Sequence, residues 1–237
     1  MNLLALETAT ESCSAALLAG ERLLARSEIA PRRHADLLLP MCEELLAEAG
    51  LARRDLAALG VGCGPGAFTG VRLAISAAQG IALALDIPIV VVSSLAALAM
   101  QAPDNGAAIL AVIDARMGEI YAGTFRRTRE GRVEAIDAEY VGPANALPLP
   151  PDSAWNVVGT GWTSYRDALL ARLAVAPSWA EGDRYPQAVD VARLAAPLAR
   201  AGKGVAPELA LPVYLRDKVA LTTDEQRASR AARGRTE

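Results

Sequence analysis

Apolar and polar positions follow two patterns along the first hundred residues. Short apolar runs bounded by turn-forming residues predict strands at residues 3–6, 13–19, 23–29, 59–62 and 87–92. Apolar positions that recur every three to four residues predict helices at residues 34–49, 69–85 and 94–101. Pro40 is expected to kink the first of these helices, and Gly50 is expected to end it. This alternation of strands and helices is typical of an α/β fold.

A second set of elements begins after a cluster of turn-forming residues at 102–106. Predicted strands follow at residues 108–113, 119–127, 133–141 and 155–158, and predicted helices at residues 164–173 and 189–201. Residues 143–151 are proline-rich and loop-like, and residues 212–215 form a short closing segment.

Both halves start with consecutive strands and then alternate helices with strands. The pattern favours two related α/β subdomains, each a mixed sheet with flanking helices. We place the first subdomain at residues 1–102 and the second at residues 103–221. The polar, Arg-rich residues 222–237 are predicted to form a disordered tail.

A glycine-rich loop, GPGAFTG at residues 64–70, separates a predicted strand from a long predicted helix. Strand, glycine loop and helix together are a geometry that can hold a phosphate or another anion, because backbone N–H groups point at the ligand. The loop lacks the Lys-Ser/Thr pair of a P-loop, which disfavours a Walker-type NTPase. Its match to a dinucleotide-binding loop is loose. Asp86 lies at about the right distance for a ribose contact, but it precedes the next apolar run instead of following it.

Composition narrows the class of protein. The chain has 237 residues, 52% of them hydrophobic, and a formal net charge of −3. This indicates a packed protein without the basic field that binding nucleic acid on its own would need. The cysteines Cys13, Cys42 and Cys63 are predicted to be buried free thiols of a reducing cytoplasm. The longest apolar stretch, residues 71–85, is too short to span a bilayer, so we expect a soluble cytoplasmic protein and no membrane partner.

Several segments together resemble one family, the bacterial TsaB (YeaZ) proteins. The matching segments are LETATESCS at 6–14, HADLLLP at 34–40, GPGAFTGVRL at 64–73, IDARMGEIY at 113–121 and PVYLR at 212–216, with a looser match for VGTGW at 158–162. The resemblance covers most of the chain up to about Leu221. It implies an actin-like/sugar-kinase (ASKHA) fold of two subdomains.

The resemblance also implies a function. TsaB-like proteins take part in making threonylcarbamoyladenosine, the modified adenosine beside the anticodon of tRNAs that read ANN codons. In that family TsaB is a non-catalytic scaffold that dimerises with its paralogue TsaD, the threonylcarbamoyltransferase. The pair recruits the ATPase TsaE and meets tRNA through the complex, and a homodimer is left open for the isolated chain. The older glycoprotease-like label reflects similarity to TsaD.

The histidine content argues against TsaD-type chemistry. TsaD-type enzymes bind a metal through two histidines at positions i and i+4 of a helix, which share one helix face. Here the first position is His34 and the second is Leu38, and the chain has no other histidine. We therefore expect no metal site of this type, no catalytic residue and no required cofactor. Cys63 has no activating base in the sequence, which disfavours a cysteine nucleophile.

A second function class stays open, a nucleotide-dependent kinase or hydrolase that uses the cleft between the subdomains. In the implied fold, Glu7 and Thr8 face this cleft, and Asp114 begins the corresponding turn of the second half. Paired carboxylates there could hold a magnesium-nucleotide such as ATP. The candidate nucleotide or anion residues are Glu7, Thr8, Gly64, Gly66, Thr69 and Asp114. The alternative is that Asp114 and Arg116 stabilise a tight turn.

Two helices are candidates for binding a partner. The helix at 69–85 is apolar or small on nearly all sides, and the helix at 34–49 has a wide apolar face. The hypothesis is that both helices pair with those of TsaD or of a second copy. The candidate interface residues are His34, Leu37, Leu38, Met41, Leu45, Arg72, Ala74, Ile75, Ala78 and Ile81. The alternative is that the two helices are buried inside one domain, with Arg72 in an ordinary surface salt bridge.

Overall fold

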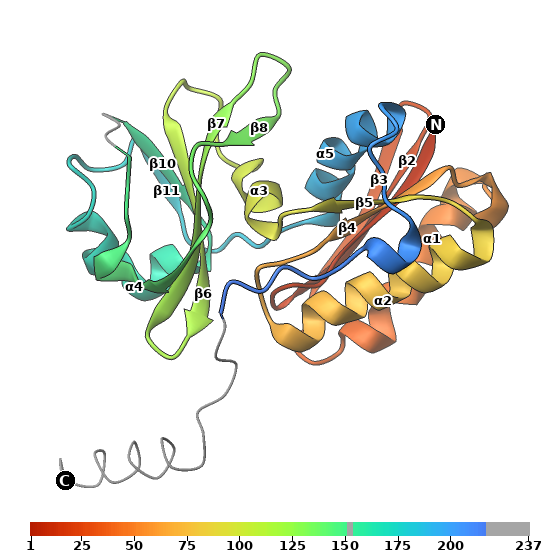
Figure 1. Ribbon diagram of the computed structural model, residues 1–237, viewed down its shortest axis with the longest axis horizontal. Coiled ribbons are helices and arrows are strands. Elements are labelled where there is room, and N and C mark those ends of the chain that lie inside the picture. The colour runs from red at the N-terminus through yellow and green to blue at the C-terminus, as the bar shows by residue number, and fades with distance from the viewer. Residues whose placement is uncertain (151–153, 217–237) are drawn as a thin grey trace, which may run out of the picture.

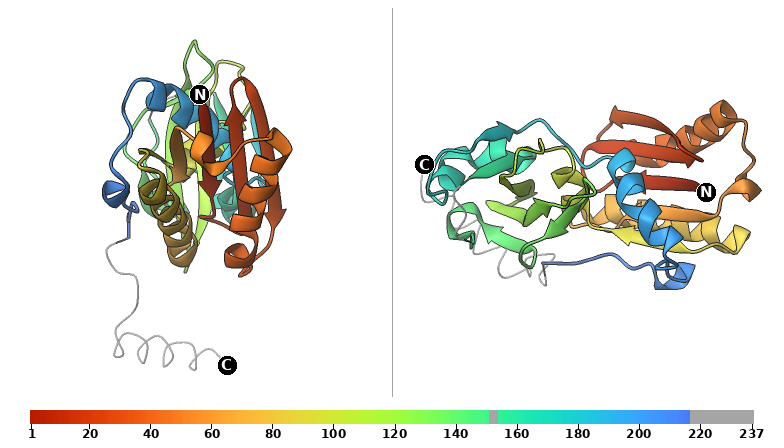
Figure 2. Two further views of the ribbon diagram at one scale, coloured as in Figure 1. Left: turned by 90° about the vertical axis from the view of Figure 1, so that its right-hand side faces the viewer. Right: turned by 90° about the horizontal axis from the view of Figure 1, so that it is seen from above.

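The computed structural model describes residues 1–150 and 154–216 and contains two α/β lobes that lie side by side (Figures 1 and 2). The sheet of the first lobe has the order β3-β2-β1-β4-β5. Its strands are β1 (Asn2–Glu7), β2 (Ser12–Ala19), β3 (Arg22–Ile29), β4 (Ala58–Gly62) and β5 (Ile89–Val92). The first three strands are antiparallel, and β4 and β5 run parallel to β1.

The sheet of the second lobe repeats this topology. Its order is β11-β10-β6-β7-β8, with β9 also paired to β7. The strands are β6 (Ala108–Arg116), β7 (Glu119–Arg127), β8 (Val133–Ala135), β9 (Tyr140–Pro143), β10 (Trp155–Val158) and β11 (Trp179–Glu181). An antiparallel β6–β7 hairpin is followed by the parallel strands β10 and β11, as β1–β2 is followed by β4 and β5. Two related lobes of actin-like type, each a mixed sheet with flanking helices, are therefore confirmed.

The helices of the first lobe cover both faces of its sheet (Figure 1). On one face, α1 (His34–Ala49) and α2 (Phe68–Leu85) cover Leu4, Leu6 and Leu59. On the other face, α5 (Ala188–Arg200) covers Leu3 and Ala5. Successive residues of β1 thus point into different cores, as the alternation of a strand requires.

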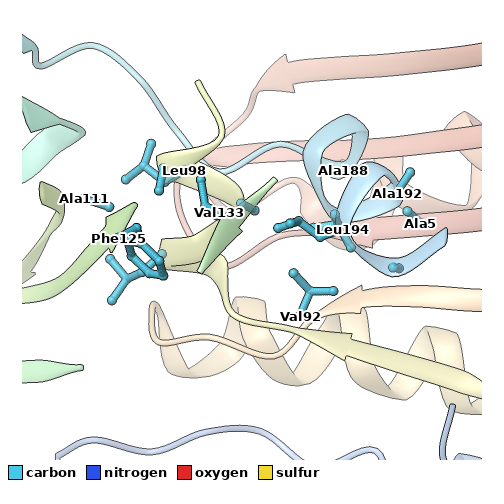
Figure 3. Packing of buried hydrophobic residues seen from close by; sticks show 14 of the residues in the cluster. Ala5, Val92, Leu98, Ala111, Phe125, Val133, Ala188, Ala192 and Leu194 are labelled. Atoms are coloured by element: carbon cyan, nitrogen blue, oxygen red, sulfur yellow. The ribbon is translucent and has the colours of Figure 1, made fainter. Parts of the chain in front are cut away.

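The last helix of each repeat packs on the other lobe. The helix after β5, α3 (Ser94–Ala99), packs on β6 and β7, whereas α5 packs on the sheet of the first lobe. Leu98 and Phe125 on the second-lobe side share one apolar cluster with Val92 and Leu194 on the first-lobe side (Figure 3). This shared core joins the lobes.

The predicted division of the chain differs from this packing. We assigned residues 103–221 to the second subdomain, but α5 and the segment after it lie on the first lobe (Figure 2). Val205 pairs with Ile89, the side chain of Gln79 donates to the carbonyl of Ala210, and the N–H of Val213 donates to the carbonyl of Cys63. We call residues 205–216 the C-terminal strap. The predicted tail at 222–237 lies outside the described residues.

Other boundaries differ locally. The predicted strand at 133–141 is two strands, β8 and β9, separated at residues 136–139. The helix predicted at 164–173 begins earlier, as α4 (Thr160–Leu170), with non-helical angles at Tyr165 that separate its first turn from the predicted part. The helix α1 spans His34–Ala49 as predicted, with Pro40 inside an unbroken helix and Gly50 in the left-handed conformation at its end. The short strand β11 has no sequence pattern that we detected.

Within the described part of the chain, α2 is the one helix that is long and apolar enough to cross a membrane by length and composition. Its inner face, including Val71, Ala74 and Ala78, is buried against the sheet of the first lobe. A core helix of a globular protein has this same composition, because it is covered on one side by its own sheet.

Candidate functional site

A cleft of about 560 Å³ opens between the lobes. It is bounded by the β1–β2 turn, the start of α1, the glycine loop, the β6–β7 turn and the C-terminal strap. Its charged and aromatic lining residues are Glu11, Arg32, His34, Phe68, Asp114, Arg116, Tyr121, Tyr214 and Arg216. Of the six residues predicted for a nucleotide or anion site, Gly66 and Asp114 line this cleft. Glu7, Thr8, Gly64 and Thr69 are not part of its lining.

The carboxylate of Glu7 is closed off from the cleft. Its Oε1 accepts from the N–H of Ala9 at 2.7 Å, and its Oε2 accepts from the hydroxyl of Ser94 at 2.7 Å. The backbone of Gly62 lies directly against it, since a Cβ built on Gly62 would fall 2.0 Å from Oε2. Burial raises the pKa of Glu7, and the hydrogen bonds from Ala9 and Ser94 lower it in part. The expectation that Glu7 faces the cleft is therefore wrong.

The glycine loop packs on the β1–β2 turn. The N–H of Ala67 donates to the carbonyl of Ala9 at 2.7 Å, and the hydroxyl of Thr8 donates to the carbonyl of Gly70 at 2.7 Å. A Cβ on Gly66 would lie 2.3 Å from the oxygen of Ala9, and a Cβ on Gly70 would lie 2.0 Å from the oxygen of Thr8. These glycines allow one backbone to approach another, which is a different use from the anion cradle predicted for the loop.

Asp114 stabilises its own turn. Its Oδ1 accepts from the N–H of Arg116 at 2.8 Å, and its Oδ2 accepts from the Arg116 guanidinium at 3.2 Å. The hydroxyls of Ser164 and Tyr165 also lie within hydrogen-bond distance, each at 3.3 Å. Arg116 and Met117 adopt left-handed backbone angles, with φ of 63° and 57°. The alternative interpretation, a tight turn held by Asp114 and Arg116, is confirmed.

Polar contacts cross the cleft or line it. Arg116 of the second lobe forms an ion pair with Glu11 of the first. Arg216 of the strap forms an ion pair with Glu119 and donates to the carbonyl of Ala115 at 3.2 Å. Sequence analysis missed Glu11 and Arg216 as cleft residues, although both lie inside the motifs that carry the family resemblance.

His34 is part of the cleft wall. Its Nε2 lies 2.9 Å from the carbonyl oxygen of Thr10, which ties the start of α1 to the β1–β2 turn. Among residues 1–150 and 154–216, no group of three or more His, Cys, Asp and Glu side chains is placed to hold a metal ion.

The three thiols are buried. Burial raises the pKa of Cys63 to about 12, and the neighbouring charges of Glu7 and Glu139 act in the same direction. Burial likewise raises the pKa of Cys13 to about 11 and that of Cys42 to about 12. A thiol nucleophile requires a lowered pKa, so Cys63 has the wrong environment for this chemistry.

Comparisons with known proteins agree with this architecture. The family TsaD, tRNA N6-adenosine threonylcarbamoyltransferase, matches residues 26–173. The chain is 38% identical to the tRNA threonylcarbamoyladenosine biosynthesis protein TsaB of Escherichia coli, over 93% of this chain and 96% of that protein. It is 39% identical to TsaB of Haemophilus influenzae, over 70% of this chain and 74% of that protein. The solved structure of YeaZ from Pseudomonas aeruginosa superposes with a TM-score of 0.84 at 43% identity, over 90% of this chain and 99% of that one.

The chain belongs to the TsaB (YeaZ) family. Its relatives of that name are proteins of tRNA threonylcarbamoyladenosine biosynthesis. The match to the TsaD family covers α1, α2 and much of the second sheet, which is consistent with a common fold for the two groups.

The helices predicted to bind a partner are largely committed to their own lobe. Most of the candidate interface residues lie in the core under α1 and α2, and a partner could reach them only if the lobe unpacked. These residues are Leu38, Met41, Leu45, Ala74, Ile75 and Ala78. Here the alternative, burial inside one domain, describes the six residues correctly. His34, Leu37, Arg72 and Ile81 are partly exposed.

The outer faces of the same helices expose other apolar residues. Leu39 of α1 and Leu83 of α2 are 51% and 62% exposed. Between the helices runs a groove of about 320 Å³, lined by Cys42, Leu46, Ile81, Ala84 and Leu85 among others. Leu39 and Leu83 fall outside the buried stripes of their helices. The spacing of apolar residues along each helix was therefore the signal that could have predicted their exposure.

Proposed function

We propose that this protein is a catalytically silent scaffold in the formation of threonylcarbamoyladenosine on tRNA. In this proposal it dimerises with the TsaD transferase, helps to recruit the TsaE ATPase and meets tRNA through the complex. It requires no cofactor of its own, acts in the cytoplasm and forms a homodimer when TsaD is absent.

The observation that carries the proposal is the state of the two carboxylates that a nucleotide enzyme would use. Glu7 is enclosed by Ala9, Ser94 and Gly62 and has no path to a ligand in the cleft. Both carboxylate oxygens of Asp114 accept hydrogen bonds within its own turn. A magnesium-nucleotide needs free carboxylate or carbonyl oxygens, so this arrangement favours a scaffold over an enzyme.

The outer faces of α1 and α2 support the choice of partner surface. Leu39 and the apolar residues of the groove between the two helices form an apolar strip beside the ion pair of Glu43 and Arg53, and Leu83 is a further exposed apolar residue of α2. Exposed apolar strips of this kind are typical of protein–protein contact sites. A paralogue with the same fold would present matching helices across a pseudo-two-fold axis.

Reconstitution tests the proposal directly. TsaC, TsaD, TsaE, unmodified tRNA, threonine, bicarbonate and ATP are combined with and without this protein, and threonylcarbamoyladenosine is measured. We expect modification that depends on this protein. Equal modification in its absence would overturn the scaffold role.

A surface variant tests the partner contact. Leu83→Asp places a charge at an exposed apolar residue of α2 and is expected to weaken binding to TsaD while the protein stays folded. Val175→Asp, at a similarly exposed apolar residue of the second lobe, is the matched control. The buried Ala78 is unsuitable for this purpose, because a charge there would unfold the lobe. Unchanged affinity for Leu83→Asp would contradict this surface.

The size of the cleft and its arginines favour a second candidate, a nucleotide-dependent kinase or hydrolase. Arg32, Arg116 and Arg216 line a cleft large enough for a nucleotide. ATP turnover by the purified protein alone, abolished by Asp114→Asn, would support this candidate over the scaffold.

A further inference from the structure

The guanidinium of Arg72 is a cation without an anionic partner in the described structure. Its Cζ lies 3.3 Å from the ring centroid of Phe68 and 4.9 Å from that of Tyr214. Its Nη1 is buried and has no hydrogen-bond acceptor in the described part of the chain. The two rings contact the guanidinium, and its Nη1 donor remains unsatisfied.

The position of Arg72 on α2 does not stabilise the helix. It lies in the second turn, just beyond the first turn in which the helix dipole favours negative charge. The first turn of α2 contains no acidic residue that would offset this charge. Among the described residues the charge of Arg72 is therefore stabilised by two aromatic rings and not by an anion, which leaves it available to an anionic ligand outside the free chain.

The surroundings of Arg72 are apolar and exposed. Phe68 and Tyr214 are 48% and 46% exposed, and Val213 of the strap, which lines the cleft wall together with both rings, is also exposed. We call Phe68, Arg72, Val213 and Tyr214 the Arg72 patch. An arginine framed by exposed aromatic and aliphatic side chains has the composition of an interface hot spot.

We propose that the Arg72 patch binds a carboxylate of the protein partner, presented by an aspartate or glutamate that is flanked by apolar side chains. This proposal rests on the proposed function, which supplies TsaD as that partner. The planar guanidinium fits a carboxylate with two parallel hydrogen bonds, and its Nε and Nη2 donors, which have no hydrogen-bond partner among the described residues and unlike Nη1 are not buried, can supply them. The apolar residues around it would exclude water from the ion pair.

A protein carboxylate fits the patch better than an RNA phosphate. The patch has one cation and an apolar rim, and the chain has a formal net charge of −3. Binding to an RNA backbone requires several phosphate contacts from a basic field. Stacking of unpaired bases on Phe68 and Tyr214 is the competing outcome that the test must separate.

The test measures the affinity of the full-length protein for TsaD by calorimetry at low and moderate salt. Arg72→Met keeps a long unbranched side chain against the rings and removes the charge, and it is expected to weaken binding roughly 30-fold. Arg72→Lys keeps the charge but lacks the planar guanidinium. Its affinity for TsaD should lie between those of the wild type and of Arg72→Met. Arg166→Met is the matched control, because Arg166 also lies over an aromatic ring, that of Trp162, on the other lobe.

Two further results decide the proposal. Added salt should weaken the wild-type complex more than the Arg72→Met complex, because the lost interaction is electrostatic. Thermal melting of each variant shows whether it is folded, and Arg72→Lys provides the comparison if Arg72→Met is unstable. Wild-type affinity of the folded variants for TsaD would overturn the proposal, as would a loss confined to tRNA binding. The proposed function would survive either result if modification still depended on the wild-type protein.

Discussion

The turn after β1 and the turn after β6 occupy corresponding places in the two lobes but have different environments. In the first, Glu7 and Thr8 are fully buried and both oxygens of the Glu7 carboxylate accept a hydrogen bond, from Ala9 and from Ser94. In the second, Arg116 and Met117 are exposed and Asp114 is bonded within an open turn. The same topology has therefore produced one closed turn and one open turn.

The difference follows from where the next helix begins. In the first lobe, Gly66 and Gly70 bring the start of α2 onto the residues of the turn itself. In the second lobe, Gly159 and Gly161 bring the start of α4 onto Val112, in the middle of β6. Both lobes use glycine for close approach, but only the first places a backbone over the turn. Solvent access to the corresponding turns of the two lobes therefore depends on where along the strand the next helix begins.

The largest effect is expected from a substitution that disrupts the contact between α2 and the β1–β2 turn. Gly70→Ala would put a methyl group 2.0 Å from the carbonyl oxygen of Thr8, and a backbone atom cannot move aside cheaply. We expect a loss of about 3 kcal/mol in the free energy of unfolding, measured by urea denaturation.

Gly80→Ala on the same helix is the matched control. A Cβ there meets no atom within 4 Å, so alanine is expected to stabilise α2 by about 1 kcal/mol. Equal effects of the two substitutions would show that helix propensity, and not the contact with the turn, determines the role of Gly70.

The next largest effect should come from the buried carboxylate. Glu7→Ala leaves the N–H of Ala9 and the hydroxyl of Ser94 without their acceptor, which should cost about 2 kcal/mol of unfolding free energy. Asp114→Ala in the open turn leaves groups that water can reach, so we expect about 1 kcal/mol or less. Chemical denaturation of both variants checks the comparison, and a larger loss for Asp114→Ala would contradict it.

Much of the fold could be predicted because its elements have strong local patterns. The helix α1 spans the residues that its periodicity indicates, with Gly50 at its end. The strands β7 and β10 likewise match their apolar runs. The exchange of α3 and α5 between the lobes could not be predicted, because the partner of an apolar helix face depends on contacts distant in the sequence.

The site was harder to predict for the same reason. An acidic residue at the end of a strand, such as Glu7, has one sequence pattern whether it faces a ligand or a serine 87 positions away. The glycines of residues 64–70 were recognised as a loop for close approach, but the sequence does not say whether a phosphate or the turn at Thr8 is approached. The wide apolar faces of α1 and α2 hid the difference between core residues such as Ala78 and exposed ones such as Leu83.

A smaller effect is expected in the pH dependence of stability. Burial raises the pKa of Glu7 in the folded state above its ordinary value of 4.5. The folded protein then binds this proton more tightly than the unfolded chain does. The resulting stabilisation is fully present below pH 4.5 and is lost as the pH rises through the raised pKa.

Glu7→Gln removes this component while keeping the shape of the side chain. The stability of the variant relative to wild type should therefore increase as the pH rises from below 4.5 towards neutrality. Urea denaturation across that range measures the difference, with Glu21→Gln on the exposed β2–β3 turn as control. A difference that stays constant with pH would contradict the raised pKa.

The smallest effect concerns the ion pair between Arg116 of the open turn and Glu11 of the closed one. Both side chains are accessible to water, so their coupling should be about 0.5 kcal/mol in a double-mutant cycle and should decrease with salt. The variants Glu11→Gln, Arg116→Gln and the double variant are compared by chemical denaturation. A coupling of this size means that the apolar cluster around Leu98 and Phe125, and not the ion pair, holds the lobes together. A coupling several times larger would instead mean that the ion pair helps to hold the lobes together. The open turn would then have a structural role like that of the closed turn, despite its exposure to solvent.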